Sequence, residues 1–168
     1  ATGDPREEIE TVFAAYAAAK PTQALVVAGD HPNAALLYAT AQRYGIVENC
    51  RFIGRVPESD LPALYASATI YLEITSYEGF GLQVLEAMAT GTTVLVSDLP
   101  VLREVAADGA MYVTPSGPEE LCNSLNRLLL DSELRESLSK RAIARAQSFS
   151  WRRCAEQTLA VYRQVLDI

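Results

Sequence analysis

The chain has 168 residues, 49% of them hydrophobic and 21% charged, with a formal net charge of −7 at pH 7. These values suit one globular domain with a full hydrophobic core, and the acidic balance without a basic patch argues against nucleic acid as a partner. The three cysteines are widely spaced without a Cys-x-x-Cys motif, and no segment resembles a signal peptide or a transmembrane helix, so we expect a cytoplasmic protein without a metal site.

The first part of the chain alternates between helices and strands. Arg6 to Lys20 is predicted to form an alanine-rich amphipathic helix, with Asp4 as its cap and Pro5 at its first position. The elements expected after it are a buried strand of continuous apolar type at 24–28, a helix at 33–44, a short strand at 51–53, a turn at 54–57 and a brief helix from Ser59 or Asp60 to Tyr65.

The second part continues this alternation and ends in helices. The expected elements are a strand at 69–74, a helix at 82–90, a strand at 93–97, a helix at 100–107, a strand at 111–113 and helices at 118–130, 132–147 and 151–166. The whole pattern predicts an α/β fold with a doubly wound parallel sheet and a helical C-terminus. In such a sheet the ligand lies beyond the carboxyl ends of the strands, which places residues 74–81 at the binding edge.

A glycine-hinged turn separates the strand at 69–74 from the helix at 82–90. Gly79 and Gly81 flank Phe80, and Leu82 opens a run of good helix formers. Such a turn presents unpaired backbone N–H groups, and the helix dipole adds partial positive charge there. We therefore predict an anion site, for a phosphate in particular, at the N–H groups of Phe80, Gly81 and Leu82. The alternative is a tight turn that serves packing alone.

The helix after the turn is apolar on nearly every side. Gln83, Glu86 and Thr90 fall together in one narrow polar stripe. A helix of this kind is normally buried, so Glu86 is expected to open onto a gap in the core. The alternative makes Glu86 a surface charge and Glu78 a carboxylate that only suits the start of the helix.

Glu-Gly-Phe-Gly-Leu followed by Leu-Glu-Ala-Met-Ala, with Glu78 and Glu86 eight positions apart, resembles the signature of the retaining glycosyltransferases of family 4, also called group 1. The resemblance covers nearly the whole chain and lies in the C-terminal, donor-binding half of the two-domain GT-B fold. It implies that residues 1–168 form a single Rossmann-like domain that binds a nucleotide diphosphate sugar as donor substrate, with no further cofactor.

The activity implied by this resemblance is transfer of a hexose to an acceptor such as a glycan or lipid. The acceptor site of the family lies on an N-terminal domain, so we expect this part alone to be inactive and the whole protein to be compatible with a membrane-peripheral location. The alternative is a non-catalytic nucleotide-binding or interaction module derived from the same fold.

The family's functional residues map onto the turn and its helix. By resemblance, Glu78 has the catalytic position, against the donor sugar, and Gly79 to Leu82 meet the sugar and phosphates. Glu86 matches the carboxylate that accepts hydrogen bonds from the ribose hydroxyls, and charge-assisted bonds of this type are strong. Arg55 and Val56 match the backbone that contacts the base.

The start of the chain departs from the family pattern. Arg6 matches a phosphate-binding arginine, but Glu7 and Glu8 follow where a lysine and a polar residue are expected, and a carboxylate beside a pyrophosphate weakens binding. The family also has a central strand before the first helix, and only 1–3 stand in its place. We expect a truncated first strand, or one supplied by another segment. A sheet that lacks it exposes two edges and favours aggregation or strand swapping.

The C-terminal segment also follows the family. Phe149-Ser150-Trp151 and Tyr162 match the terminal helix, which in full-length members crosses to the other domain. We expect Trp151 to anchor the start of this helix. Residues 97–105 match a family segment that is expected to pack around the site.

Overall fold

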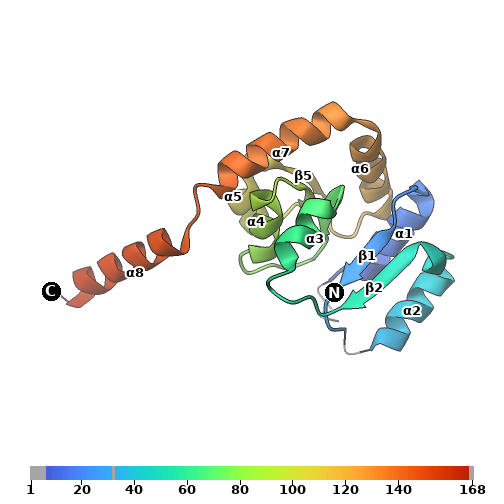
Figure 1. The fold of residues 1–168 in the computed structure, drawn as a ribbon, viewed down its shortest axis with the longest axis horizontal. Coiled ribbons are helices and arrows are strands. Elements are labelled where there is room, and N and C mark those ends of the chain that lie inside the picture. The colour runs from blue at the N-terminus through green and yellow to red at the C-terminus, as the bar shows by residue number, and fades with distance from the viewer. Residues whose placement is uncertain (1–6, 32, 167–168) are drawn as a thin grey trace.

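The computed structural model describes residues 7–31 and 33–166, and it has an α/β fold in which helices and strands alternate along the chain (Figure 1). The elements are α1 (Ile9–Ala19), β1 (Leu25–Ala28), α2 (Ala34–Arg43), η1 (Val47–Asn49), β2 (Cys50–Gly54), α3 (Leu61–Ser67), β3 (Ile70–Glu73), α4 (Leu82–Ala89), β4 (Thr93–Ser97), α5 (Pro100–Ala106), η2 (Ala107–Gly109), β5 (Ala110–Val113), α6 (Pro118–Leu130), α7 (Ser132–Ala146) and α8 (Trp151–Leu166).

The start of the first helix is the clearest difference from the expected elements. Helix α1 begins at Ile9 instead of Arg6. The chain before it is instead bonded to the residues that follow β3: Glu7 forms an antiparallel bridge with Thr75, and the Glu8 N–H donates to the Ile74 carbonyl at 3.0 Å. The predicted cap Asp4 and the first-position Pro5 lie outside the described residues.

All the strand pairs of the described residues are parallel, which confirms the predicted parallel α/β class. β1 pairs with β2, and β3, β4 and β5 form a second sheet in that order. On β3, Ile70 and Leu72 pack with α1 and α6, whereas Tyr71 packs with α3, α4 and α5 on the opposite face. The helices therefore cover both faces, as a doubly wound fold requires.

A slot separates the two sheets. β1 and β3 do not pair with each other in the described part of the chain, and a cavity of about 1310 Å³ is lined by residues of both. Residues of α1 and α6 line it on one side and residues of α3 and α4 on the other. Val26 on β1 is 46% exposed at this slot. The prediction of a buried strand at 24–28 is therefore wrong for most of the stretch: within it Val27 alone is buried and both Ala24 and Val26 are exposed, because one edge of β1 is uncovered.

Helix α8 extends away from the body of the domain (Figure 1). Its residues are exposed throughout, and Trp151 at its start is 78% exposed. The expectation that Trp151 anchors this helix is therefore wrong for the structure described. Within residues 7–31 and 33–166, every helix is too short or too polar to cross a lipid bilayer.

Candidate functional site

The turn before α4 requires glycine at position 81. Gly81 adopts a left-handed conformation, with φ 89° and ψ 47°, which L-residues with a side chain avoid. A Cβ at this position would also lie 2.7 Å from the Leu102 Cδ2 atom of α5. Val84 and Met88 bury α4 in the core behind it. The first turn of α4 is thus held in a fixed position at the carboxyl end of β3.

The amides of the turn converge on the carboxylate of Glu78. Its Oε1 atom accepts hydrogen bonds from the N–H groups of Gly79, Phe80 and Gly81, at 2.8, 3.1 and 3.2 Å. The expectation that the Phe80 and Gly81 amides are unpaired is therefore wrong in this conformation. Three successive N–H groups around one oxygen nevertheless form the kind of concavity that binds anions. Leu82 adds the first N–H of α4, which has no acceptor within the helix.

A buried hydroxyl holds the chain that leads into this turn. The Ser97 Oγ atom, at the end of β4, accepts a hydrogen bond from the Thr75 N–H at 2.8 Å, and Ser97 is fully buried. The Thr75 hydroxyl in turn donates to the Tyr77 carbonyl at 2.8 Å. The family pattern predicted packing near the site around 97–105, but it did not reveal this bond, which depends on the register between β3 and β4.

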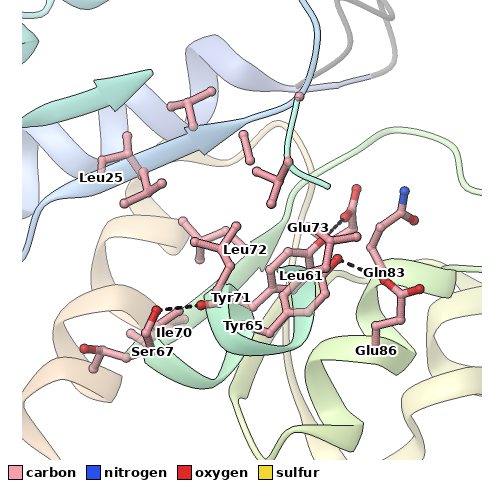
Figure 2. Close-up of a pocket in the computed structure, with 18 of the residues that line it drawn as sticks. Leu25, Leu61, Tyr65, Ser67, Ile70, Tyr71, Leu72, Glu73, Gln83 and Glu86 are labelled. Carbon is pink, nitrogen blue, oxygen red and sulfur yellow. Dashed lines mark hydrogen bonds between the residues drawn. The ribbon is translucent and has the colours of Figure 1, made fainter. Parts of the chain in front are cut away.

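The polar stripe of α4 faces the slot. Gln83, Glu86 and Thr90 all line the cavity, as the expected gap beside Glu86 requires. Glu86 is half-buried, and its Oε2 atom accepts a hydrogen bond from the Tyr65 hydroxyl of α3 at 3.1 Å (Figure 2). Burial and then the negative charge of Glu86 raise the pKa of Tyr65. Tyr65 therefore stays a neutral donor that orients the Glu86 carboxylate.

A second tyrosine and carboxylate pair lies next to the first one. The Tyr71 hydroxyl donates to Glu73, and the Tyr71 and Tyr65 rings pack edge to face with centroids 5.4 Å apart (Figure 2). Burial raises the pKa of Glu73, although the bond from Tyr71 opposes this rise. Glu73 is an unusual residue for a strand interior, and its bond to Tyr71, two positions earlier on the same face of β3, explains how it is accommodated.

The cavity brings together some of the predicted site residues and leaves out others. Arg55, Val56, Leu82 and Glu86 line it, whereas the residues from Glu78 to Gly81 border the amino end of α4 without lining it. Arg6 lies outside the described residues. Arg55 is the single cation among the described lining residues, and the described part of the chain contains no cluster of three or more His, Cys, Asp and Glu that could hold a metal ion.

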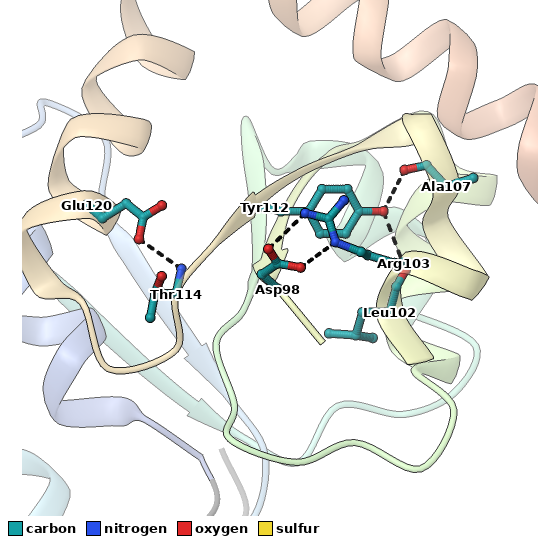
Figure 3. Close-up of polar contacts among 7 residues, drawn as sticks. All are labelled: Asp98, Leu102, Arg103, Ala107, Tyr112, Thr114 and Glu120. Carbon is teal, nitrogen blue, oxygen red and sulfur yellow. Dashed lines mark hydrogen bonds and ion pairs between the residues drawn. The ribbon is translucent and has the colours of Figure 1, made fainter. Parts of the chain in front are cut away.

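The loop after β4 is braced by a separate polar cluster (Figure 3). The Arg103 guanidinium forms a bidentate ion pair with Asp98, with Nη2 to Oδ2 at 2.8 Å, and it lies 4.5 Å from the ring centre of Tyr112. This ion pair lowers the pKa of the Asp98 carboxyl. The Tyr112 hydroxyl donates to the Ala107 carbonyl at 2.6 Å. Arg103 is thus engaged in holding α5 and β5 together.

Comparison with known proteins agrees with the motif. A family profile described as glycosyl transferases group 1 matches residues 2–145. The O-antigen chain mannosyltransferase B of Escherichia coli is 38% identical over 113 residues, which cover 67% of this chain and 30% of the relative. The chain thus spans about a third of the length of such curated relatives.

Solved structures share the fold over almost all of the chain. The sucrose-phosphate synthase of Thermosynechococcus elongatus superposes with a TM-score of 0.91 and 29% identity, over 99% of this chain and 44% of that one. Anabaena HepE in complex with UDP and glucose gives a TM-score of 0.87 at 22% identity, over 96% and 46% of the two chains, and at this identity the likeness concerns the fold alone. Together with the family profile, these likenesses establish that the chain belongs to the group 1 glycosyltransferases, with the α/β architecture of the GT-B fold.

Proposed function

We propose that this chain is the donor-binding domain of a retaining glycosyltransferase that transfers a hexose from a nucleotide diphosphate sugar to an acceptor such as a glycan or lipid. The observation that carries the proposal is the placement of Glu86 in the cavity, beside a turn whose amides already converge on an oxygen anion. Family membership supports the transfer of a sugar, and the Escherichia coli relative is named a mannosyltransferase.

In this proposal, three parts of the site bind three parts of the donor: the ribose, the base and the diphosphate. The Glu86 carboxylate accepts the two ribose hydroxyls, and Tyr65 keeps it oriented. The backbone near Arg55 and Val56, across the same cavity, contacts the base. The amides of 79–82 and the amino end of α4 stabilise the charge that develops on the departing diphosphate. Stabilisation of developing charge by fixed dipoles is usually the largest single contribution to catalysis. Arg6 is the proposed additional phosphate ligand.

Glu78 has two tasks in this proposal. Its carboxylate holds the amides of Gly79, Phe80 and Gly81, and a bound diphosphate competes for the same N–H groups. When the diphosphate takes these amides, the Glu78 side chain turns away and becomes available to the sugar hydroxyls. One movement thus prepares the phosphate site and places the carboxylate against the anomeric carbon, where it favours positive charge.

Glu78→Ala is expected to separate these two tasks. The variant should bind a free nucleoside diphosphate at least as tightly as the unchanged chain, because no carboxylate competes for the amides. Its affinity for the nucleotide diphosphate sugar should fall by about 10- to 100-fold relative to its affinity for the nucleoside diphosphate, because a hydrogen bond to a charged group contributes about 1.5–3 kcal/mol. Calorimetric titration of both ligands measures this split. An equal loss for both ligands would instead mean that Glu78 only shapes the turn.

A panel titration tests the proposal as a whole. We expect the chain to bind at least one of the UDP-, GDP- and ADP-sugars, with the nucleoside diphosphate as the minimal ligand. Inorganic phosphate and the free sugar serve as controls for non-specific binding. If no nucleotide binds even when the slot is filled as described below, the chain is better described as a non-catalytic module derived from the same fold.

The slot between β1 and β3 belongs to the same proposal. We propose that a parallel strand, supplied by polypeptide that precedes α1, fills it, and that the acceptor site lies on a further domain. The bridge between Glu7 and Thr75 and the bond from Glu8 to Ile74 hold the start of α1 at the carboxyl end of β3. A parallel strand that ran through the slot alongside β1 and β3 would therefore have its carboxyl end at the same edge as the start of α1.

A further inference from the structure

Phe80 is the one side chain between the two glycines of the turn. Glycine gives the backbone on either side of it wide conformational freedom, so a contact on the Phe80 side chain restricts the direction of the amides of 79–81 in addition to their bonds to Glu78. Phe80 is 45% exposed, and its position does not rest on burial in the core. The contact that holds its ring therefore bears directly on the geometry of the turn.

That contact comes from the far end of the chain. The Phe149 ring meets the Phe80 ring edge to face, with centroids 6.2 Å apart and planes at 78°, which is a favourable geometry for an aromatic pair. Phe149 lies in the short link between α7 and α8, next to Trp151 at the start of α8. The link is thus in contact with the turn, although α8 itself extends away from the domain.

The Phe149 ring is itself held in position. The Arg145 guanidinium lies 4.7 Å from the centre of the Phe149 ring, a cation–π distance. Its Nε and Nη2 atoms donate to the carbonyls of Val105 and Glu104, at 3.0 and 2.6 Å. These carbonyls belong to α5, the same helix whose Leu102 side chain closes on Gly81. Helix α5 therefore supports the turn directly at Gly81 and indirectly, through Arg145 and Phe149, at Phe80.

We infer that Phe149 is a positioning residue for the donor site: through Phe80 it keeps the amides of 79–81 in the arrangement that receives the diphosphate. This inference rests on the proposed function for its ligand, but the contact can be tested without one. Because Phe149 also lies in the link between α7 and α8, a displacement of α8 is transmitted to the turn. Trp151 is the single tryptophan of the chain, so its fluorescence reports on the start of α8.

Phe149→Leu tests the inference through hydrogen exchange of the amides of 79–81. Their bonds to Glu78 make them protected groups, and we expect the variant to exchange them about 2- to 10-fold faster, the worth of one aromatic pair. Phe149→Tyr keeps the ring and should restore the slow exchange. Tyr162→Leu removes an exposed aromatic side chain from α8 and should leave the exchange unchanged.

Donor affinity gives the second measurement. Phe149→Leu should weaken nucleotide diphosphate sugar binding by about 2- to 10-fold. The double variant Phe80→Leu/Phe149→Leu should lose no more affinity than the single variant that binds less tightly, because both substitutions remove the same contact. Faster exchange without any nucleotide binding in the unchanged chain would support the positioning role and reject the proposed function. Unchanged exchange in Phe149→Leu would overturn the inference, whatever the chain binds.

Discussion

Glu86→Gln is expected to weaken the binding of a nucleotide diphosphate sugar by about 10- to 100-fold, because a hydrogen bond to a charged group contributes about 1.5–3 kcal/mol. The amide has nearly the same size as the carboxylate and still accepts from the Tyr65 hydroxyl, so the fold should be retained. The loss should be equal for the nucleoside diphosphate without a sugar, since the proposed partner of Glu86 is the ribose. Calorimetry and thermal unfolding of the same samples measure both effects.

A matched control comes from the first turn of α7. Glu133 is exposed there, and Glu133→Gln removes one carboxylate charge without touching the cavity. This variant should bind the donor as the unchanged chain does. If Glu86→Gln instead unfolds the domain while the remaining folded protein binds normally, Glu86 is a structural residue and the ribose role is wrong.

Filling the slot between β1 and β3 is expected to give the largest gain in stability. We would extend the chain at its start by about five β-branched residues, which suit a strand with both faces covered. Burial contributes about 1.5–3 kcal/mol per side chain and ordering costs about 1.5 kcal/mol per residue, which leaves a net gain of about 4 kcal/mol. The melting temperature should therefore rise by roughly 10 °C.

An extension of equal length made of glycine and serine is the control, because it adds the chain without the apolar side chains. It should leave the melting temperature and the tendency to associate unchanged. Size-exclusion chromatography should show fewer oligomers for the β-branched extension, since it covers the open edges of β1 and β3. A chain that is already monomeric and highly stable without any extension would contradict the strand proposal.

Local signals predicted most of this fold because strands and helices of a parallel α/β domain carry distinct patterns. The glycine turn, β4 and the polar stripe of α4 lie where the sequence places them. The start of α1 was mispredicted because the pairing of Glu7 with Thr75 joins residues far apart in the sequence. The same reason explains the missed bond between Ser97 and Thr75, and the missed support of Phe80 by Phe149.

Side-chain chemistry near the site was harder to predict than the elements. A glycine-flanked helix start indicates free amides, and nothing in the local pattern indicates that Glu78 turns back to occupy them. The role of Tyr65 beside Glu86 depends on how α3 packs against α4, which no periodicity reveals. Glu73 is an unusual residue for the interior of a strand, and its presence is explained only by its hydroxyl partner Tyr71.

The scarcity of cations around the cavity has a consequence for how a ligand arrives. The described lining residues include one cation, Arg55, and four glutamates, Glu7, Glu58, Glu73 and Glu86. The net charge of the chain is −7. Such a field repels a polyanion at long range instead of steering it inward. Recognition is then a matter of directional bonds formed at contact, and the encounter itself should be slow and should speed up as dissolved salt shortens the reach of that repulsion.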